Sequence, residues 1–188
     1  MKNRTLYGIK KNGEIPTDGI YVKNEEEAGL SANSNIKYHQ NAEQYVINLL
    51  KPLNLEKYTK EPTEIDLIGE LDGKIIYIEV ERDYATRKWT TSKNFPYPLI
   101  NIPIEKRRHF QKYRHTSFYL KFNRPMYEVF IIHGEDILSN TKKQNLTANH
   151  NNNYAERTFL RAKKEFALFT NAKDSEKIIE FISSKIGI

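Results

Sequence analysis

Apolar and polar residues alternate on both sides of Asp72-Gly73, in the stretch EIDLIGELDGKIIYIEVERD (residues 64–83). This dipeptide between alternating runs is typical of a two-residue hairpin turn, which places Leu71 opposite Lys74. Because the side chains of a strand point alternately to opposite faces, one face of the hairpin is apolar. That face predicts a core made from Ile65, Leu67, Leu71, Ile76, Ile78 and Val80.

The opposite face of the predicted hairpin carries carboxylates. The same register places Asp66 opposite Glu79 and Glu64 opposite Glu81. Like charges that face each other across a ladder destabilise it, by roughly 3 kcal/mol at about 5 Å and an effective dielectric constant of about 20. Water at an exposed strand end would relieve this repulsion. A divalent cation would also relieve it, since hard cations prefer oxygen ligands.

Helical periodicity marks three further segments. Apolar positions repeat along one face of residues 41–50, and Pro52 ends that helix. Residues 104–115 predict a basic helix. A closing helix is predicted at about 173–187, with Asp174 as its cap and an inward face formed by Ile178, Ile182 and Ile186.

The remaining segments predict strands and loops. Apolar runs indicate strands at about 99–104, 117–123 and 127–134, whereas 158–169 is ambiguous between helix and strand. Asn12-Gly13 suggests a hairpin near the amino terminus, and the Asn-rich segment 139–153 predicts a mobile loop. We therefore expect one α/β domain over residues 1–188, with a core at about 36–135 and a mixed sheet flanked by helices.

Composition narrows the class of protein and its partners. The chain has 188 residues, of which 38% are hydrophobic and 29% charged, and it has no cysteine. That excludes disulfides and thiolate metal sites, and no apolar run predicts a secretory signal or a membrane span, so we expect a cytoplasmic protein without a membrane partner.

The charge distribution points to a polyanionic partner. The net charge is +6. Basic residues crowd just after the acidic hairpin, at Arg82, Arg87, Lys88, Lys93, Lys106, Arg107, Arg108, Lys112 and Arg114. A cluster of acidic residues next to many basic residues suits a metal-dependent enzyme that acts on phosphodiesters. In such an enzyme the basic side chains bind the phosphate backbone and the acidic side chains bind the metal ion.

The order helix, hairpin, basic helix, strand, with Asp66 followed thirteen residues later by Glu79-Val80-Glu81, resembles the PD-(D/E)XK nuclease superfamily. This restriction-endonuclease-like and Holliday-junction-resolvase-like core runs α-β-β-β-α-β. Asp66 matches the motif Asp and Glu79 the motif Glu, while Glu81 stands where the family usually has Lys. The resemblance covers at most residues 41–123, and residues outside the core are additions at both termini.

The resemblance implies a Mg²⁺-dependent nuclease, with Mn²⁺ as an alternative ion and DNA favoured over RNA. Asp66, Glu79 and Glu81 would be catalytic residues and metal ligands, and Glu43 matches an acidic residue that several branches add to the metal site. Lys88 or Lys93 are candidates to replace the missing motif Lys. The predicted nucleic-acid contacts are Arg82, Arg87, Lys88, Lys93, Lys106, Arg107 and Arg108.

Two other readings of the sequence stay open. The same fold could serve a non-catalytic nucleic-acid-binding protein, which would bind without metal. A carboxylate-rich metal-binding domain with another substrate would show no salt-dependent DNA binding. The sequence does not distinguish endonuclease from exonuclease, and it leaves the oligomeric state open, with a homodimer as one alternative.

Overall fold

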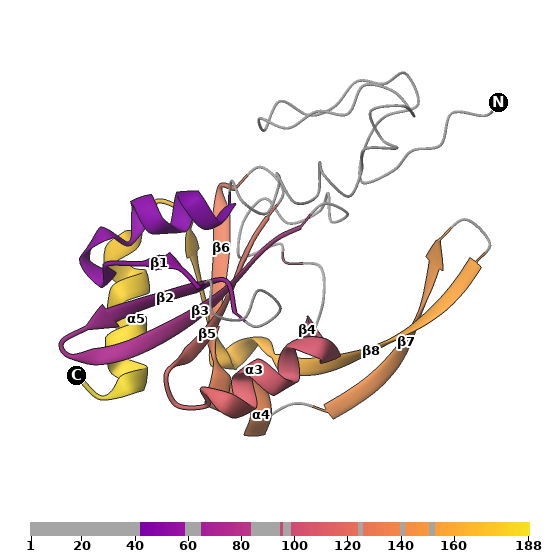
Figure 1. Cartoon of the computed structure of the whole chain (residues 1–188). Helices are drawn as coiled ribbons and strands as arrows, with labels where there is room; N and C mark the ends of the chain where they lie inside the picture. Colours follow the sequence, from indigo (N-terminus) through magenta and orange to yellow (C-terminus); the bar gives the residue numbers. More distant parts are fainter. Residues whose placement is uncertain are drawn as a thin grey trace, which may run out of the picture.

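The computed structural model describes residues 42–58, 65–83, 95, 99–123, 126–139, 142–150 and 153–188. Its centre is a six-stranded sheet with the order β1-β2-β3-β5-β6-β9 (Figure 1). These strands are β1 Glu56–Lys57, β2 Leu67–Leu71, β3 Lys74–Arg82, β5 Ser117–Phe122, β6 Glu128–His133 and β9 Ala167–Asn171. Strands β3 and β5 are parallel, whereas the other neighbouring pairs are antiparallel. The predicted mixed central sheet is therefore confirmed.

Helices flank this sheet, close to where the sequence predicts them. Residues 42–49 form a helix that passes into the 3-10 turn η1, and the predicted basic helix is formed by η3 and then α3. The bounds of the labelled helices are η1 Lys51–Leu53, η3 Ile104–Lys106, α3 Arg107–Lys112, α4 Gly134–Ser139, η4 Lys164–Phe166 and α5 Ser175–Ile186. Asp174 caps α5, as predicted, by accepting a hydrogen bond from the backbone N–H of Lys177.

A second sheet replaces the predicted mobile loop. Strands β4 Leu99–Pro103, β8 Asn153–Lys163 and β7 Lys142–His150 lie in the order β4-β8-β7, and the β7–β8 hairpin extends away from the central sheet (Figure 1). The expectation of a loop over 139–153 is thus wrong for the residues of β7. Backbone pairing with β8 forms this strand, although the Asn-rich sequence lacks the alternation of apolar residues that signals a half-buried strand.

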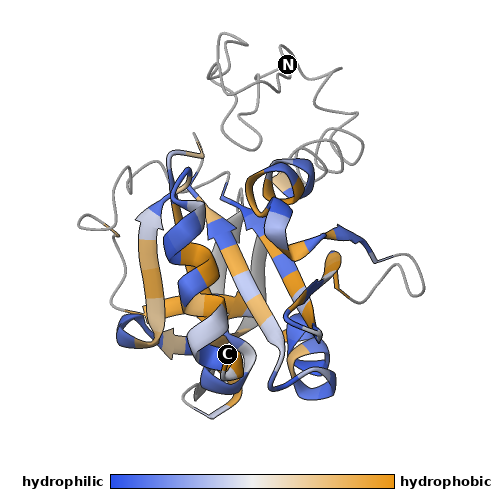
Figure 2. Cartoon of the chain, turned by 90° about the vertical axis from the view of Figure 1, so that its left-hand side faces the viewer, coloured by the Kyte–Doolittle hydropathy of each residue, from blue (hydrophilic) through white to orange (hydrophobic). Residues whose placement is uncertain are grey.

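The central sheet separates two apolar cores because its inner strands bury both faces. On one face, even-numbered residues of β3 and β5 pack under α5 and the helix at 42–49. In Figure 2, α5 lies in front of the sheet, and hydrophilic and hydrophobic residues alternate along its ribbon. On the other face, Tyr119 and Phe130 pack against Phe110 of α3 and against β4 and β8. Residues 77, 79 and 81 of β3 point to this second side.

The central hairpin forms in the predicted register. Leu71 pairs with Lys74 and Leu67 with Ile78, and the turn residues Asp72 and Gly73 have φ values of 48° and 77°, as a type I′ turn requires. The ladder ends at Leu67, one residue before the predicted pairing of Asp66 with Glu79.

Gly69 of β2 tests how closely the hairpin packs on η1. A Cβ atom at this position would press against the backbone carbonyl oxygen of Leu53 and lie 2.7 Å from Leu55 Cδ2. We expect Gly69→Ala to lower the free energy of unfolding by about 1–3 kcal/mol through overpacking, as measured by urea denaturation. The neighbouring exposed variant Glu70→Ala is the control and should stay within about 0.5 kcal/mol of wild type. Equal midpoints for both variants would contradict the predicted contact.

Within the part of the chain that the structure describes, no helix is long and apolar enough to cross a membrane.

Candidate active site

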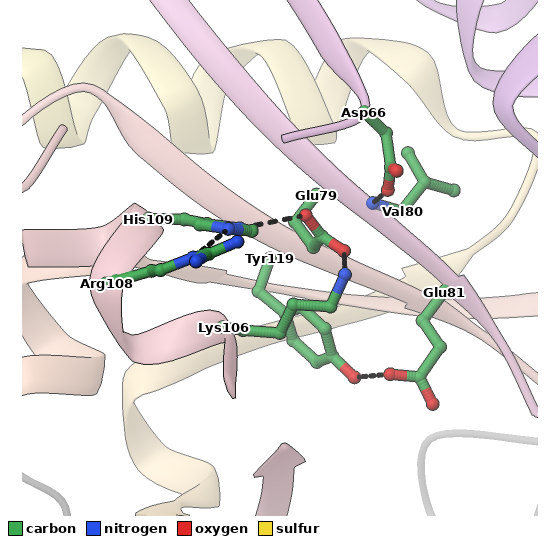
Figure 3. Close-up of polar contacts among 8 residues, drawn as sticks. All are labelled: Asp66, Glu79, Val80, Glu81, Lys106, Arg108, His109 and Tyr119. Carbon is green, nitrogen blue, oxygen red and sulfur yellow. Dashed lines mark hydrogen bonds and ion pairs between the residues drawn. The ribbon is translucent and has the colours of Figure 1, made fainter. Parts of the chain in front are cut away.

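The hairpin brings Asp66 and Glu79 together, although not as a ladder pair. Asp66 stands just before β2, and its Oδ2 accepts a hydrogen bond of 2.7 Å from the backbone N–H of Val80 (Figure 3). Glu79 lies in the middle of β3 and is only 2% exposed. The two carboxyl groups influence each other electrostatically. This local geometry follows from the turn, because a two-residue turn fixes which residues end up beside each other.

Lys106 supplies a positive charge to this acidic pair. It is the last residue of η3, and its Nζ donates a hydrogen bond to Glu79 Oε1 and forms an ion pair with it (Figure 3). Burial lowers the pKa of Lys106, but the carboxylates of Glu79, Asp66 and Glu81 outweigh that effect, so the pKa is raised. Lys106 therefore stays protonated beside the acids.

His109 lies against the other oxygen of Glu79. His109 Nδ1 is 3.7 Å from Glu79 Oε2, and both side chains are nearly fully buried. Arg108 Nε donates to His109 Nε2 at 3.2 Å. Among the described residues, neither Glu79 Oε2 nor His109 Nδ1 has a hydrogen-bond partner. Buried polar atoms are normally satisfied, so these two atoms keep hydrogen-bonding capacity that a polar ligand could use.

The protonation of Asp66 reflects its surroundings. Burial is the first cause and the negative charge of Glu79 the second, and together they raise the pKa of Asp66 to about 8, against the lowering effects of Lys106 and the Val80 N–H. Without another cation, Asp66 is thus mostly protonated at neutral pH. A divalent ion beside Asp66 and Glu79 would favour the charged carboxylate and lower that pKa.

Glu81 points to the same face of the sheet as Glu79 but is bound by β5. Glu81 Oε2 accepts a hydrogen bond from the Tyr119 hydroxyl (Figure 3), and Glu81 Oε1 lies 2.7 Å from Lys121 Nζ. Burial, followed by the charge of Glu81, raises the pKa of Tyr119 well above its usual value, so the phenol remains a donor. Both Glu81 oxygens are therefore engaged, and neither is aimed at Asp66.

Glu43 lies near the pair without joining it. Its carboxylate forms an ion pair of 2.8 Å with Lys57 and is 15% exposed, and its charge contributes a small further increase to the pKa of Asp66. Within the described residues, no group of three His, Asp or Glu side chains is arranged to hold a metal ion.

The two remaining carboxylates fit a hard divalent cation of the Mg²⁺ type. Asp66 keeps one oxygen outside its bond to Val80, and Glu79 Oε2 has no hydrogen-bond partner in the described chain. Mg²⁺ is usually held by one or two carboxylates, and waters and substrate phosphates fill its other positions. Asp66 and Glu79 would hold such an ion.

The predicted nucleic-acid contacts divide into three groups. Arg82 is 1% exposed, so the structure does not offer its side chain to a phosphate backbone. Lys106 faces Glu79, whereas Arg107 is half-buried and Arg108 exposed. The other predicted contacts lie outside the described residues: Arg87, Lys88 and Lys93. The predicted amino-terminal hairpin and Glu64 also lie outside them.

Lys106 and His109 are two residues of the acidic site that the sequence did not predict there. Both lie on one face of the basic segment, together with Phe110 and Tyr113, at the spacing i, i+3, i+4 and i+7 that marks the inward side of a helix. Phe110 is fully buried in the second core, and Tyr113 stacks on Tyr77 of β3 at 3.7 Å between ring centroids. This periodicity was the signal that could have placed Lys106 beside β3.

Together, the mixed sheet, the hairpin with Asp66 and Glu79, and the helix that follows it form a mixed α/β arrangement that is consistent with a restriction-endonuclease-like fold. One solved structure similar to this chain is Hjc from Archaeoglobus fulgidus, a Holliday junction resolvase (7% identity, TM-score 0.42), matched over 69% of this chain and 87% of that one. Another is D212, a nuclease from a fusselovirus (13% identity, TM-score 0.37), matched over 83% of this chain and 95% of that one. No protein-family model and no curated protein sequence matches the chain. At these values neither likeness carries an argument about function.

Proposed function

We propose that this protein is a Mg²⁺-dependent nuclease that hydrolyses phosphodiester bonds of nucleic acid, with DNA as the first substrate to test. The observation that carries the proposal is the Asp66–Glu79 pair on the central hairpin, with the Lys106 ammonium bonded to Glu79. A raised carboxyl pKa beside a specific charged partner is a pattern that recurs at catalytic sites.

Asp66 and Glu79 would hold the ion, with Mn²⁺ as an alternative. When bound, it supplies a Lewis acid that lowers the pKa of a coordinated water and offsets negative charge on the phosphate. Lys106 would face the same phosphate and stabilise the charge that develops on its oxygens. Glu81 is bound by Tyr119 and Lys121. It would orient the Tyr119 and Lys121 side chains and would not act as the general base.

A second candidate function is a nucleic-acid-binding protein without cleavage activity. The observation in its favour is that Lys106 already neutralises Glu79 without a metal ion. Such a protein would bind nucleic acid equally well in EDTA and in Mg²⁺.

One assay separates these functions. The full chain is incubated with branched, single-stranded and duplex DNA in Mg²⁺, Mn²⁺ or EDTA, and binding and cleavage are followed together. The nuclease proposal expects cleavage with either ion and none in EDTA. Binding without cleavage under every condition would favour the second candidate, and absence of both would remove nucleic acid as the substrate.

The basic helix makes a separate prediction about binding. The proposal assigns phosphate contacts to Arg107 and Arg108, so replacing both with Ala should weaken binding uniformly across sequences. It should also reduce the slope of log K against log salt concentration by roughly 1–2, because each lost phosphate contact removes about 0.9 from that slope. The measurement is fluorescence anisotropy in EDTA at several salt concentrations. Lys177→Ala, on the exposed side of α5, is the control, and an unchanged slope in the double variant would mean that these arginines do not contact phosphate.

A further inference from the structure

A cavity of about 190 Å³ opens beside Glu81, on the face of the sheet that also carries Glu79 and Lys106. It lies between the central sheet and β4, and β8 contributes to its wall. Glu79 and Glu81 are two residues apart on β3, so their Cα atoms lie about 7 Å apart and the cavity borders the neighbour of Glu79 on the same face of the strand. A nucleotide attached to a phosphate at Asp66 and Glu79 could therefore place its base there.

Aromatic rings form the apolar wall of this cavity. Phe95, Phe130 and Phe159 line it from three separate segments. Phe95 contacts the edge of Phe130, with 5.8 Å between ring centroids, and the Lys164 ammonium lies 5.4 Å from the Phe95 ring. These contacts with Phe130 and Lys164 hold the Phe95 ring in place. The aromatic rings of the wall are flat surfaces of the kind on which nucleobases stack.

The polar edge of the cavity is rich in hydrogen-bond acceptors. Asn101 Oδ1 is buried and has no hydrogen-bond partner among the residues that the structure describes. The carboxylates of Glu81 and Asp83 also line the space. Lys121 also lines the space but is paired with Glu81, so the lining keeps a net negative charge, which disfavours a phosphate and favours a ligand that carries N–H donors.

The volume sets the size of that ligand. The cavity has a volume of about 190 Å³. That is less than the roughly 300 Å³ or more typical of sites for drug-sized ligands. It suits one heterocyclic base and is too small for a base pair.

We propose that this cavity is a binding site for one unpaired nucleobase that carries an amino group: adenine, cytosine or guanine. The inference rests on the proposed nuclease function. It specifies which base the protein would prefer next to the phosphodiester bond that is cleaved. The base would lie against the Phe95, Phe130 and Phe159 rings and donate N–H hydrogen bonds to Asn101 Oδ1 and the carboxylate edge. Thymine and uracil have no amino group and would bind less well.

The test uses labelled single strands of thymidines in which one adenine, cytosine or abasic position is moved along the strand. Binding to the full chain is measured by fluorescence anisotropy in EDTA, so that no strand is cut. We expect one register at which adenine or cytosine raises affinity about tenfold over thymine, as good hydrogen bonds to a base can provide. An abasic position in that register should bind more weakly than thymine.

Asn101→Leu has a similar shape but lacks the acceptor. It should lose the preference for adenine or cytosine over thymine. Asn48→Leu, an exposed site on the helix at 42–49, is the matched control and should keep that preference. The abasic strand tests the same site on the wild-type protein, so the result does not depend on how the variant folds.

Equal affinity for every base and every register, with cleavage in Mg²⁺ intact, would overturn the base site and leave the nuclease proposal standing. A register-specific preference without cleavage in any ion would support the base site and overturn the nuclease. If no strand binds and none is cut, both proposals fall.

Discussion

In EDTA at about pH 8.5, Asp66→Asn should be more stable than the wild-type protein by ~2–4 kcal/mol. The physical reason is the raised pKa of Asp66, which burial and the charge of Glu79 bring to about 8. Each pKa unit corresponds to about 1.4 kcal/mol. The expected gain is smaller than the full shift implies, because Asn is a weaker acceptor than a carboxylate for the Val80 N–H.

The sign of the pH dependence follows from proton linkage. Asp66 has a pKa near 4 when the chain is unfolded and about 8 when it is folded, so between these values the folded state holds a proton that the unfolded state has released. The free energy of unfolding contributed by Asp66 therefore falls as pH rises from about 4 to about 8. The Asn variant should lack this decrease.

The measurement is urea denaturation of both proteins in EDTA at about pH 5 and about pH 8.5. Asp72→Asn is the matched control, since Asp72 is exposed in the turn of the same hairpin and Asn tolerates its positive φ. The control should follow the wild-type protein at both pH values. If Asp66→Asn also follows the wild-type protein, Asp66 is not held protonated by burial and by the charge of Glu79.

Mg²⁺ should reverse the order of stability while removing function from the variant. At about pH 8.5, an ion that binds only the folded wild-type protein stabilises it by RT ln(1 + [M]/Kd), and Asp66→Asn should show a much smaller rise in melting temperature. Its cleavage rate should fall by about a thousandfold or more, equivalent to ~4 kcal/mol of transition-state stabilisation. Full cleavage by a folded Asp66→Asn variant would contradict the proposed site.

The sequence could predict the hairpin because all of its determinants are local. The Asp72-Gly73 turn and the period of two fix the register of β2 and β3, and they bring Asp66 near Glu79. The sequence could not predict that the β2–β3 ladder stops at Leu67. Beyond it, the N–H of Val80 donates a hydrogen bond to the Asp66 side chain and not to a backbone carbonyl of the facing strand.

The hydrogen-bond partners of Glu81 are residues distant in sequence, Tyr119 and Lys121. The parallel pairing of β3 with β5 places Lys121 beside Glu81 and Tyr119 beside Glu79. A motif read along one strand cannot reveal which residues a neighbouring strand will supply. The same limit applies to β7, whose polar sequence gains its strand conformation from pairing with β8.

The missing motif Lys illustrates a third limit. Lys88 and Lys93 are the replacements that the sequence predicts, because they follow the hairpin closely, and both lie outside the described residues. The structure instead brings in Lys106 from η3, since the next helix packs its inward face on β3 and β5. The helical periodicity was visible in the sequence, but the crossing of the helix over Glu79 was not.

Lys106→Met should act on stability in the opposite direction to Asp66→Asn. Without Lys106, the Glu79 carboxylate remains 2% exposed beside Asp66 and loses the cation bonded to it. Removing one partner of a buried ion pair costs about 3–5 kcal/mol, and we expect ~2–3 kcal/mol here because Lys106 is 29% exposed. Cleavage should fall about a hundredfold or more, as it does when a donor that stabilises transition-state charge is lost.

The same substitution should strengthen the response to metal. In the wild-type protein a divalent ion and Lys106 share the negative charge of Glu79, whereas in Lys106→Met the ion is left as the partner of both carboxylates. Mg²⁺ should therefore raise the melting temperature of Lys106→Met by more than that of the wild-type protein, even though cleavage is lost. Lys112→Met, at the exposed end of α3, is the control and should change neither the metal response nor cleavage. A smaller metal response in Lys106→Met would mean that Lys106 helps to hold the ion site open, and full cleavage would exclude Lys106 from the reaction.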